Sequence, residues 1–408
     1  MVNTHLKNSN ILWLLARAMQ TNTSDAPPGD IAWLAIDEIA KKHVVLPLVF
    51  QAALSLPSFQ RPPAELLQAW KRYTLGTVIH NERSMRAQSE AVSMLQVAGI
   101  PCAVLKGASV AALYPRPEMR ALGDIDLLVR KEHCEKAAGI LEAHGYQRYE
   151  IDHAFHIGFI GESAYMELHY AISRFPASQA GRHIAARLED APNRAKTARI
   201  APYAFPVLSE PDQALSLLLH MERHIVDEGI GLRQLCDWCA FAASLAPETL
   251  EAQVLPTIRE CRLYQFASTL TKICVDWLGL DAQRHAWCMH VPGQTSDALL
   301  ADILDNGNIL ANSPERSAST SLVKGEESTD GRRSMLSTAT HNLTSLARKQ
   351  FPILNRMPVL LPAFWVYLPV RYLYRIARGT RPKQSVRKIA GYALRRKRLY
   401  RRLELFKR

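Results

Sequence analysis

Apolar positions follow a helical period over the N-terminal quarter of the chain. Apolar side chains recur every three or four positions in residues 10–20, 31–42 and 63–98, and clusters of proline and glycine separate these stretches. We therefore expect an N-terminal helical region, placed at residues 1–97.

The pattern changes after this region. Short apolar runs at 101–105 and 125–129 and an alternating run at 165–170 are typical of strands, and a helical stretch at 132–144 separates the last two. Strands interleaved with helices predict a compact unit, placed at residues 98–175. The expected fold class is α+β or mixed α/β, with a small mixed sheet flanked by helical regions.

Helical periodicity returns in the C-terminal half. Residues 176–310 begin with a proline-rich part that predicts loops and one or two strands, and helical patterns start at Asp212, interpreted as an N-cap. Residues 311–345 are rich in Ser and Thr and predict a flexible linker. Residues 346–408 form an apolar and aromatic, then basic, extension whose longest apolar part, 357–370, is shorter than a membrane span.

Composition and charge narrow the class of protein. Hydrophobic residues make up 48% of the 408 positions and charged residues 22%, which excludes a wholly disordered or collagen-like chain. The net charge of +12 is concentrated at the C-terminus, since residues 371–408 carry fifteen Lys and Arg against one acid. The body of the protein is therefore close to neutral.

The seven cysteines show no spacing of a disulfide framework, and the N-terminus has no recognisable secretory signal. We expect a cytoplasmic protein with free thiols. Cys236 and Cys239 form a CxxC pair, but no second pair accompanies it and His220 and His224 precede it. Thiols in the core are favoured over a zinc site.

Three acidic residues are candidate metal ligands. Asp124 and Asp126 stand two positions apart on a predicted strand, so their side chains are expected on one face, about 6–7 Å apart along the strand. Parallel carboxylates repel unless a cation lies between them, and their oxygens suit Mg²⁺. Glu167 shares a strand face with His169 and would supply the third acid of a two-metal site. His169 itself is more typical of a packed, hydrogen-bonded histidine than of a ligand.

A phosphate-binding turn is predicted upstream of the acids. Gly107 and Ser109 follow the first predicted strand, where backbone N–H groups and a hydroxyl can bind a phosphate at a helix N-terminus. Lys106 and Arg120 are the cations placed to neutralise a triphosphate.

This combination resembles the DNA polymerase β-type nucleotidyltransferase superfamily, which has a Gly-x-Ser turn, an Asp-x-Asp strand and a later single acid. More narrowly, the motifs at 105–107, Arg120, 124–129 and 167–169 resemble an uncharacterised bacterial nucleotidyltransferase family. The later segment from His220 to Asp237 also resembles that family, whose members are often encoded beside exopolysaccharide genes.

The resemblance implies an activity and a set of roles. Asp124, Asp126 and Glu167 would hold two Mg²⁺ ions, while Gly107 and Ser109 would form the phosphate turn. The reaction would transfer a nucleoside monophosphate group from an NTP, most simply ATP, to a hydroxyl-bearing acceptor, with a link to exopolysaccharide biosynthesis.

His169 and three polar residues further along, His220, Arg233 and Asp237, are accessory candidates. His220 and His224 share one helix face, as do Arg233 and Asp237. Their polar contacts either hold a helical subdomain together or belong to a helix face that closes over the nucleotide. In the second case Arg233 would lie near a phosphate, and Asp237 would orient Arg233.

The basic C-terminus predicts an amphipathic helix. Residues at 389, 392, 396, 399, 403 and 406 follow helical spacing and are apolar except for Arg396. Such a helix can bind an anionic membrane surface, which would place the protein peripherally at the inner face of the membrane, or pack on the protein with its charges solvated. Nucleic acid is a less favoured partner.

Two rival functions stay open beside a nucleotidyltransferase. One is a catalytically silent protein of the same fold that acts at the membrane surface. The other is an RNA-acting nucleotide adder that uses its basic tail as a grip.

Overall fold

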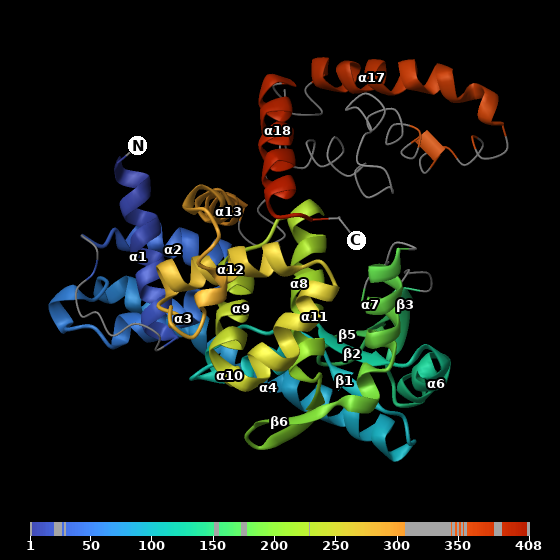
Figure 1. Ribbon diagram of the computed structural model, residues 1–408, viewed down its shortest axis with the longest axis horizontal. Coiled ribbons are helices and arrows are strands. Elements are labelled where there is room, and N and C mark those ends of the chain that lie inside the picture. The colour runs from blue at the N-terminus through green and yellow to red at the C-terminus, as the bar shows by residue number, and fades with distance from the viewer. Residues whose placement is uncertain are drawn as a thin grey trace.

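The computed structural model places a seven-stranded mixed sheet among helices, so the predicted fold class is confirmed (Figure 1). The described residues, apart from a few isolated ones, are 2–19, 30–150, 155–172, 178–227, 229–306, 357–378 and 386–405.

The sheet has the strand order β3-β4-β5-β2-β1-β7-β6. Its strands are β1 (Cys102–Val104), β2 (Ile125–Val129), β3 (Gln147–Glu150), β4 (His156–Ile160), β5 (Tyr165–His169), β6 (Lys196–Ile200) and β7 (Tyr203–Val207). The pairs β2–β5 and β1–β7 are parallel, and the other neighbours are antiparallel.

The sheet is larger than the sequence pattern predicted. The three predicted strands correspond to β1, β2 and β5. The strands β3 and β4 were not predicted. The strands β6 and β7 match the one or two strands expected after residue 176, but they extend the sheet beyond the expected limit at residue 175, because β7 pairs with β1. A parallel partner far along the chain leaves no local signal of its pairing.

Helices cover both faces of the sheet, and others, such as α17 (Leu361–Ala377) and α18 (Val386–Arg402), lie away from it (Figure 1). The other α-helices of the described residues are α1 (Val2–Ala18), α2 (Trp33–Lys42), α3 (Leu46–Leu54), α4 (Ala64–Val97), α5 (Ala108–Ala111), α6 (Cys134–Ala143), α7 (Gln179–Glu189), α8 (Glu210–Asp227), α9 (Leu232–Ser244), α10 (Pro247–Thr249), α11 (Leu255–Glu260), α12 (Tyr264–Leu278) and α13 (Gly293–Asn306). The predicted helices at 31–42, 63–98 and 132–144 correspond closely to α2, α4 and α6, whereas α3 was not predicted.

The N-cap predicted at Asp212 is wrong, because α8 begins two residues earlier at Glu210. Asp212 lies in the first turn and is fully buried. Its carboxylate accepts bonds from Arg187 at 2.6 Å and from Arg194 at 3.1 Å. The aspartate thus holds α7 and the turn after it against α8.

The alternation along β2 places its side chains in two different cores. Ile125, Leu127 and Val129 belong to a cluster shared with α4 and α6, while Leu128 belongs to the larger cluster formed with the helices. Because residue 126 points to the same side as residue 128, Asp126 faces the helical layer. This fixed alternation directs Asp126 toward α8 and α9.

The seven cysteines are buried and form no disulfide. Burial raises the pKa of the Cys236 thiol, and the neighbouring Cys239 adds to the effect. Both residues belong to the helical core, as the sequence predicted for this pair.

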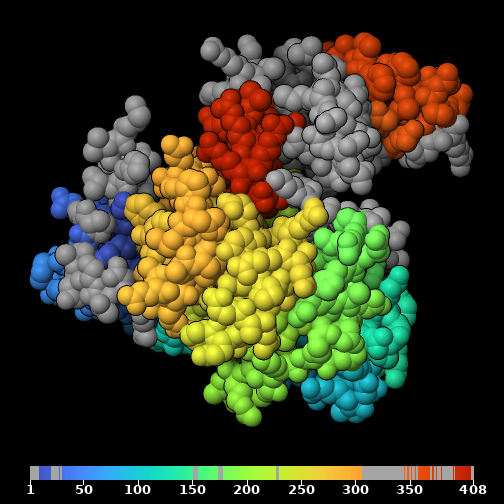
Figure 2. Space-filling model, viewed as in Figure 1, coloured from blue at the N-terminus to red at the C-terminus, as the bar shows by residue number. Residues whose placement is uncertain are grey.

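The basic helix α18 packs on the body of the protein beside α13 (Figure 2). Arg396, Leu399 and Leu403 of the predicted stripe are buried, and Phe406 lies outside the described residues. The stripe thus contacts protein, as the packing interpretation required, while Arg395, Arg398, Arg401 and Arg402 are exposed. Binding of these charges to an anionic membrane stays a prediction.

The helix α17 carries exposed aromatic and aliphatic side chains, among them Trp365, Tyr367 and Tyr374. None of the helices in the described ranges combines the length and the apolar character that crossing a bilayer requires.

Candidate functional site

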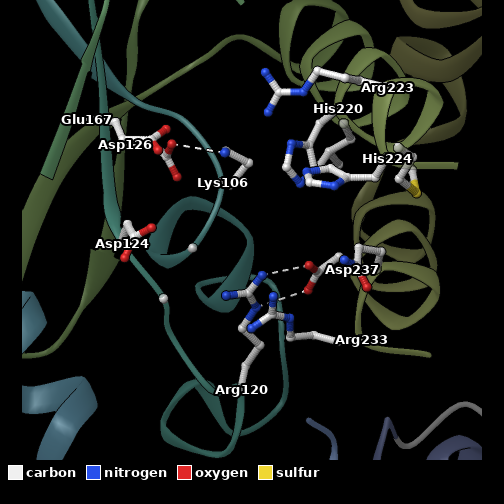
Figure 3. Close-up of a pocket in the computed structure, with 15 residues that line it drawn as sticks. Lys106, Arg120, Asp124, Asp126, Glu167, His220, Arg223, His224, Arg233 and Asp237 are labelled. Carbon is white, nitrogen blue, oxygen red and sulfur yellow. Dashed lines mark hydrogen bonds and ion pairs between the residues drawn. The ribbon is translucent and has the colours of Figure 1, made fainter. Parts of the chain in front are cut away.

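A pocket of about 210 Å³ lies between the sheet and the helices α8 and α9 (Figure 3). Nine of the eleven site residues predicted from the sequence line it: Lys106, Gly107, Arg120, Asp124, Asp126, Glu167, His220, Arg233 and Asp237. The other two, Ser109 and His169, are not among the lining residues.

Register brings two of the acids together on the sheet wall. Asp126 on β2 and Glu167 on β5 are direct neighbours in a parallel pair, so their carboxylates project from the same face. Asp124 precedes β2 and faces the same pocket (Figure 3). The three acids thus line a single wall, although Asp124, predicted on the strand beside Asp126, lies just before it.

Asp126 is buried and already carries two cationic or donor partners. Its Oδ1 lies 2.9 Å from Nζ of Lys106 and 2.8 Å from Nε2 of His169. Burial opposes ionisation of this carboxyl, but Lys106 and His169 outweigh it and lower the pKa of Asp126. The carboxylate is therefore ionised throughout the neutral range.

His169 contacts both Asp126 and Glu167. Its Nε2 is also 3.0 Å from Oε2 of Glu167. Burial would lower the pKa of His169, but its bonds to Asp126 and Glu167 raise it, and the same bond helps to lower the pKa of Glu167 against the effect of burial. His169 is thus a hydrogen-bonded packed histidine, as expected, yet it contacts two predicted ligands.

Asp124 has the opposite electrostatic environment. Burial, followed by repulsion from Glu167 and Asp126, raises the pKa of Asp124. No described residue forms an ion pair with it. A carboxylate that is partly desolvated beside two others, without a cation of its own, fits a site for a hard divalent cation such as Mg²⁺.

The turn after β1 lines the pocket with Gly107, and not with the hydroxyl of Ser109 that the sequence predicted. Gly107 has a φ of 62° and a ψ of −112°, a conformation that favours glycine. The Ser109 hydroxyl donates to the Leu105 carbonyl and accepts from Nε2 of Gln213 at 3.2 Å. Ser109 therefore stabilises the turn from inside, whereas Gly107 lines the pocket.

The helical wall is built on a buried ion pair between Arg120 and Asp237. Nη2 of Arg120 lies 2.6 Å from Oδ2 of Asp237, and Nε lies 3.1 Å from Oδ1. The Tyr114 hydroxyl donates to the same carboxylate at 2.7 Å. Asp237 therefore orients Arg120, and not Arg233 as the sequence interpretation had it.

The segment that carries Arg120 is held by a residue of the long helix α4. The Asn81 amide donates to the carbonyls of Glu118 and Arg120, each at 3.0 Å, and its Oδ1 accepts from the Leu122 N–H at 2.9 Å. Neither Asn81 nor Tyr114 was predicted. A lone polar residue in a helical pattern is the only sequence signal for Asn81, and it is too common to be informative.

Basic residues of α8 and α9 complete the helical wall. Arg233 lines the pocket near Arg120, and burial together with that like charge lowers the pKa of Arg233 to about 10. The rings of His220 and His224 meet edge to face at 4.3 Å. Burial, and then the charge of Lys106, lowers the pKa of His220 well below its ordinary value, so His220 is neutral. Arg223, which the sequence did not single out, also lines the pocket.

Carboxylates thus face guanidinium and ammonium groups across one small space (Figure 3). Divalent cations can bind the carboxylates of the sheet wall, and the oxygens of a polyphosphate can bind the basic groups of the helical wall. The arrangement can hold a metal–polyphosphate complex between the sheet and the helices.

Comparison with known proteins agrees with this chemistry. Residues 29–279 match a family described as an uncharacterised nucleotidyltransferase, and since this range covers more than half of the chain, the protein belongs to that family. No curated protein was found to match the chain significantly. The family implies nucleotidyl transfer in general and a nucleoside triphosphate as substrate, and the matched range contains every residue of the pocket.

Proposed function

We propose that the protein is a Mg²⁺-dependent nucleotidyltransferase that moves a nucleoside monophosphate group from an NTP, with ATP as the first candidate, to a hydroxyl-bearing acceptor. The observation that carries the proposal is the pocket itself, in which Asp124, Asp126 and Glu167 face Arg120 and Arg233. Family membership supplies the general reaction.

In this reaction the acceptor oxygen attacks the α-phosphorus, and the bond from that phosphorus to the bridging oxygen breaks. Pyrophosphate leaves with the bonding electron pair. Asp124, Asp126 and Glu167 would hold the Mg²⁺, which would supply Lewis-acid stabilisation of the charge that develops during transfer. Glu167, the direct neighbour of Asp126 on the adjacent strand, receives the proton of the acceptor hydroxyl.

The helical wall binds and orients the triphosphate. Arg120 presents its guanidinium in the orientation set by Asp237, and Arg233 adds a second planar donor set beside it. Neutral His220 offers a hydrogen bond without adding a charge. Lys106 is within reach of Asp126 and of the pocket, so it can pair with phosphate oxygens when a cation takes its place at the carboxylate.

The test is transfer of label from each of the four NTPs, in the presence of Mg²⁺ and cell extract, by the full chain and by Asp126→Asn. The variant keeps the shape of the side chain but removes a negative charge, so we expect transfer to be lost while the fold is kept. Glu132→Gln, an exposed acid outside the pocket, is the matched control and should transfer normally. Full activity of Asp126→Asn would refute the assignment.

The same labelling identifies the acceptor. A labelled saccharide would support the link to exopolysaccharide biosynthesis that the family resemblance suggested. Label in RNA that depends on residues 371–408 would instead support a nucleotide adder.

The ion pair between Lys106 and Asp126 favours a second candidate, a silent protein of the same fold. Its Asp126 charge is balanced without any metal. Calorimetry with Mg²⁺ and a non-hydrolysable NTP analogue separates the two candidates. Binding supports the enzyme, and its absence in the intact protein supports the silent candidate.

A further inference from the structure

Two buried histidines meet one of the pocket acids on the sheet. His156 on β4 and His169 on β5 are direct neighbours in the antiparallel pair, and Glu167 lies two residues before His169 on the same face. The ring centroids of the histidines are 5.0 Å apart. The register of β4 and β5 therefore places two imidazoles and a carboxylate close together on one face of the sheet.

Donor atoms of these residues converge. Nε2 of His169 is 3.0 Å from Oε2 of Glu167, and Nε2 of His156 is 3.7 Å from Oε1. One ligand atom from each of the three side chains lies within 4.8 Å of the others. Ligands bound to a common metal at about 2.1 Å are separated by roughly 3–4 Å, so small side-chain rotations bring all three into range.

We propose that His156, Glu167 and His169 bind one divalent transition-metal ion, of the zinc or manganese class, beneath the nucleotide pocket. The donor set decides the class of metal. Imidazole nitrogen suits zinc and other transition metals, whereas Mg²⁺ prefers oxygen ligands and keeps several waters. Two imidazoles with a carboxylate also leave coordination positions open.

Burial makes this site different from the oxygen-rich wall beside it. The side chains of His169 and His156 are 3% and 7% exposed, whereas that of Glu167 is 22% exposed and lines the pocket. On the same face, a Cβ at Gly158 would lie 2.7 Å from the Tyr149 ring, so this ring covers the strand next to His156. Glu167 therefore connects the pocket, which it lines, to the two buried imidazoles, which it contacts.

The proposal does not depend on nucleotidyl transfer, because the ion can be measured without a nucleotide. Untagged full-length protein, stripped with a chelator, is titrated with Co²⁺ and followed by the visible absorption of the bound ion. In excess Mg²⁺, which occupies the oxygen-rich wall, we expect one equivalent of Co²⁺ to bind, an absorption typical of nitrogen and oxygen ligands, and displacement by Zn²⁺.

Variants test the histidine ligands. His156→Gln removes one imidazole and should weaken Co²⁺ binding at least tenfold, whereas His144→Gln, an exposed histidine outside the pocket, should leave it unchanged. His156→Asp retains a metal-binding group and should restore part of the affinity. Circular dichroism shows whether each variant is folded.

Two results would overturn the proposal: no Co²⁺ bound by the folded wild-type chain, or equal affinities in wild type and His156→Gln. Neither result bears on the proposed transfer reaction, which Asp126→Asn tests separately. If the wild-type chain bound Co²⁺ but transferred no nucleotide, the metal site would stand and the proposed transfer reaction would be refuted.

Discussion

The buried ion pair between Arg120 and Asp237 gives the sharpest quantitative prediction. Both residues are 5% exposed, and the Asp237 carboxylate accepts three bonds, two from Arg120 and one from Tyr114. Asp237→Asn keeps the side-chain shape but removes the charge. It also replaces one acceptor oxygen by an NH₂ group that faces the guanidinium.

The magnitude follows from what remains buried. Removing one partner of a buried ion pair costs about 3–5 kcal/mol, because the other charge keeps its desolvation penalty. The guanidinium of Arg120 retains only one good acceptor on residue 237 and its bond of 3.0 Å to the Ala121 carbonyl. We therefore expect Asp237→Asn to lower the free energy of unfolding by about 3–5 kcal/mol.

The pair formed by Arg116 and Glu118 is the matched control. Their contact is as close, at 2.9 Å, but the side chains are 49% and 41% exposed. Exposed pairs contribute about 0–1 kcal/mol, so Glu118→Gln should change little.

Urea unfolding followed by tryptophan fluorescence measures both variants. The indole of Trp238, next to Asp237, is buried and bonded to Thr271 at 2.9 Å, so it reports on this part of the core. A loss below about 1 kcal/mol in Asp237→Asn would show that water or another group compensates Arg120, and would refute the reasoning.

Two further predictions concern the pocket. Burial and the charges of Glu167 and Asp126 raise the pKa of Asp124, so ionisation of this carboxyl destabilises the folded protein as the pH rises above the ordinary carboxyl range. Asp124→Asn should therefore raise the melting temperature at neutral pH in the presence of a chelator. In acid, where Asp124 is protonated, the variant should melt at the same temperature as the wild type. Gly107→Ala should lower the free energy of unfolding by about 1–3 kcal/mol in denaturation experiments, because the left-handed φ of 62° is strained for alanine. Gly139→Ala in α6, where a Cβ meets nothing within 4 Å, should not destabilise the protein.

The sheet wall could be predicted because its signals are local. Alternation along β2 sets the direction of Asp126, and alternation along β5 sets that of Glu167. The sequence did not contain the pairing of these two strands, but the family resemblance supplied it. The acids therefore line one wall, as predicted.

The helical wall could be predicted only in part, because its contacts join residues far apart in the chain. The i, i+4 spacing placed Arg233 and Asp237 on one helix face, but it could not show that Arg120 takes the carboxylate. The prediction that the Ser109 hydroxyl binds a phosphate meets a different, local obstacle. Its hydroxyl satisfies the carbonyl of Leu105 four residues earlier, a local bond that competes with binding a phosphate.

The packing of α18 gives the basic C-terminus a role that needs neither lipid nor nucleic acid. The guanidinium of Arg396 donates to the carbonyls of Ile225 and Val226, and the Tyr400 hydroxyl also donates to Ile225. These carbonyls lie in the last turn of α8, where backbone acceptors lack helical partners and a positive charge is favourable. Since α8 also carries His220, a helix outside the matched range 29–279 stabilises one wall of the pocket. The buried arginine that interrupts the apolar stripe of α18 is therefore explained by the end of α8 on which it packs.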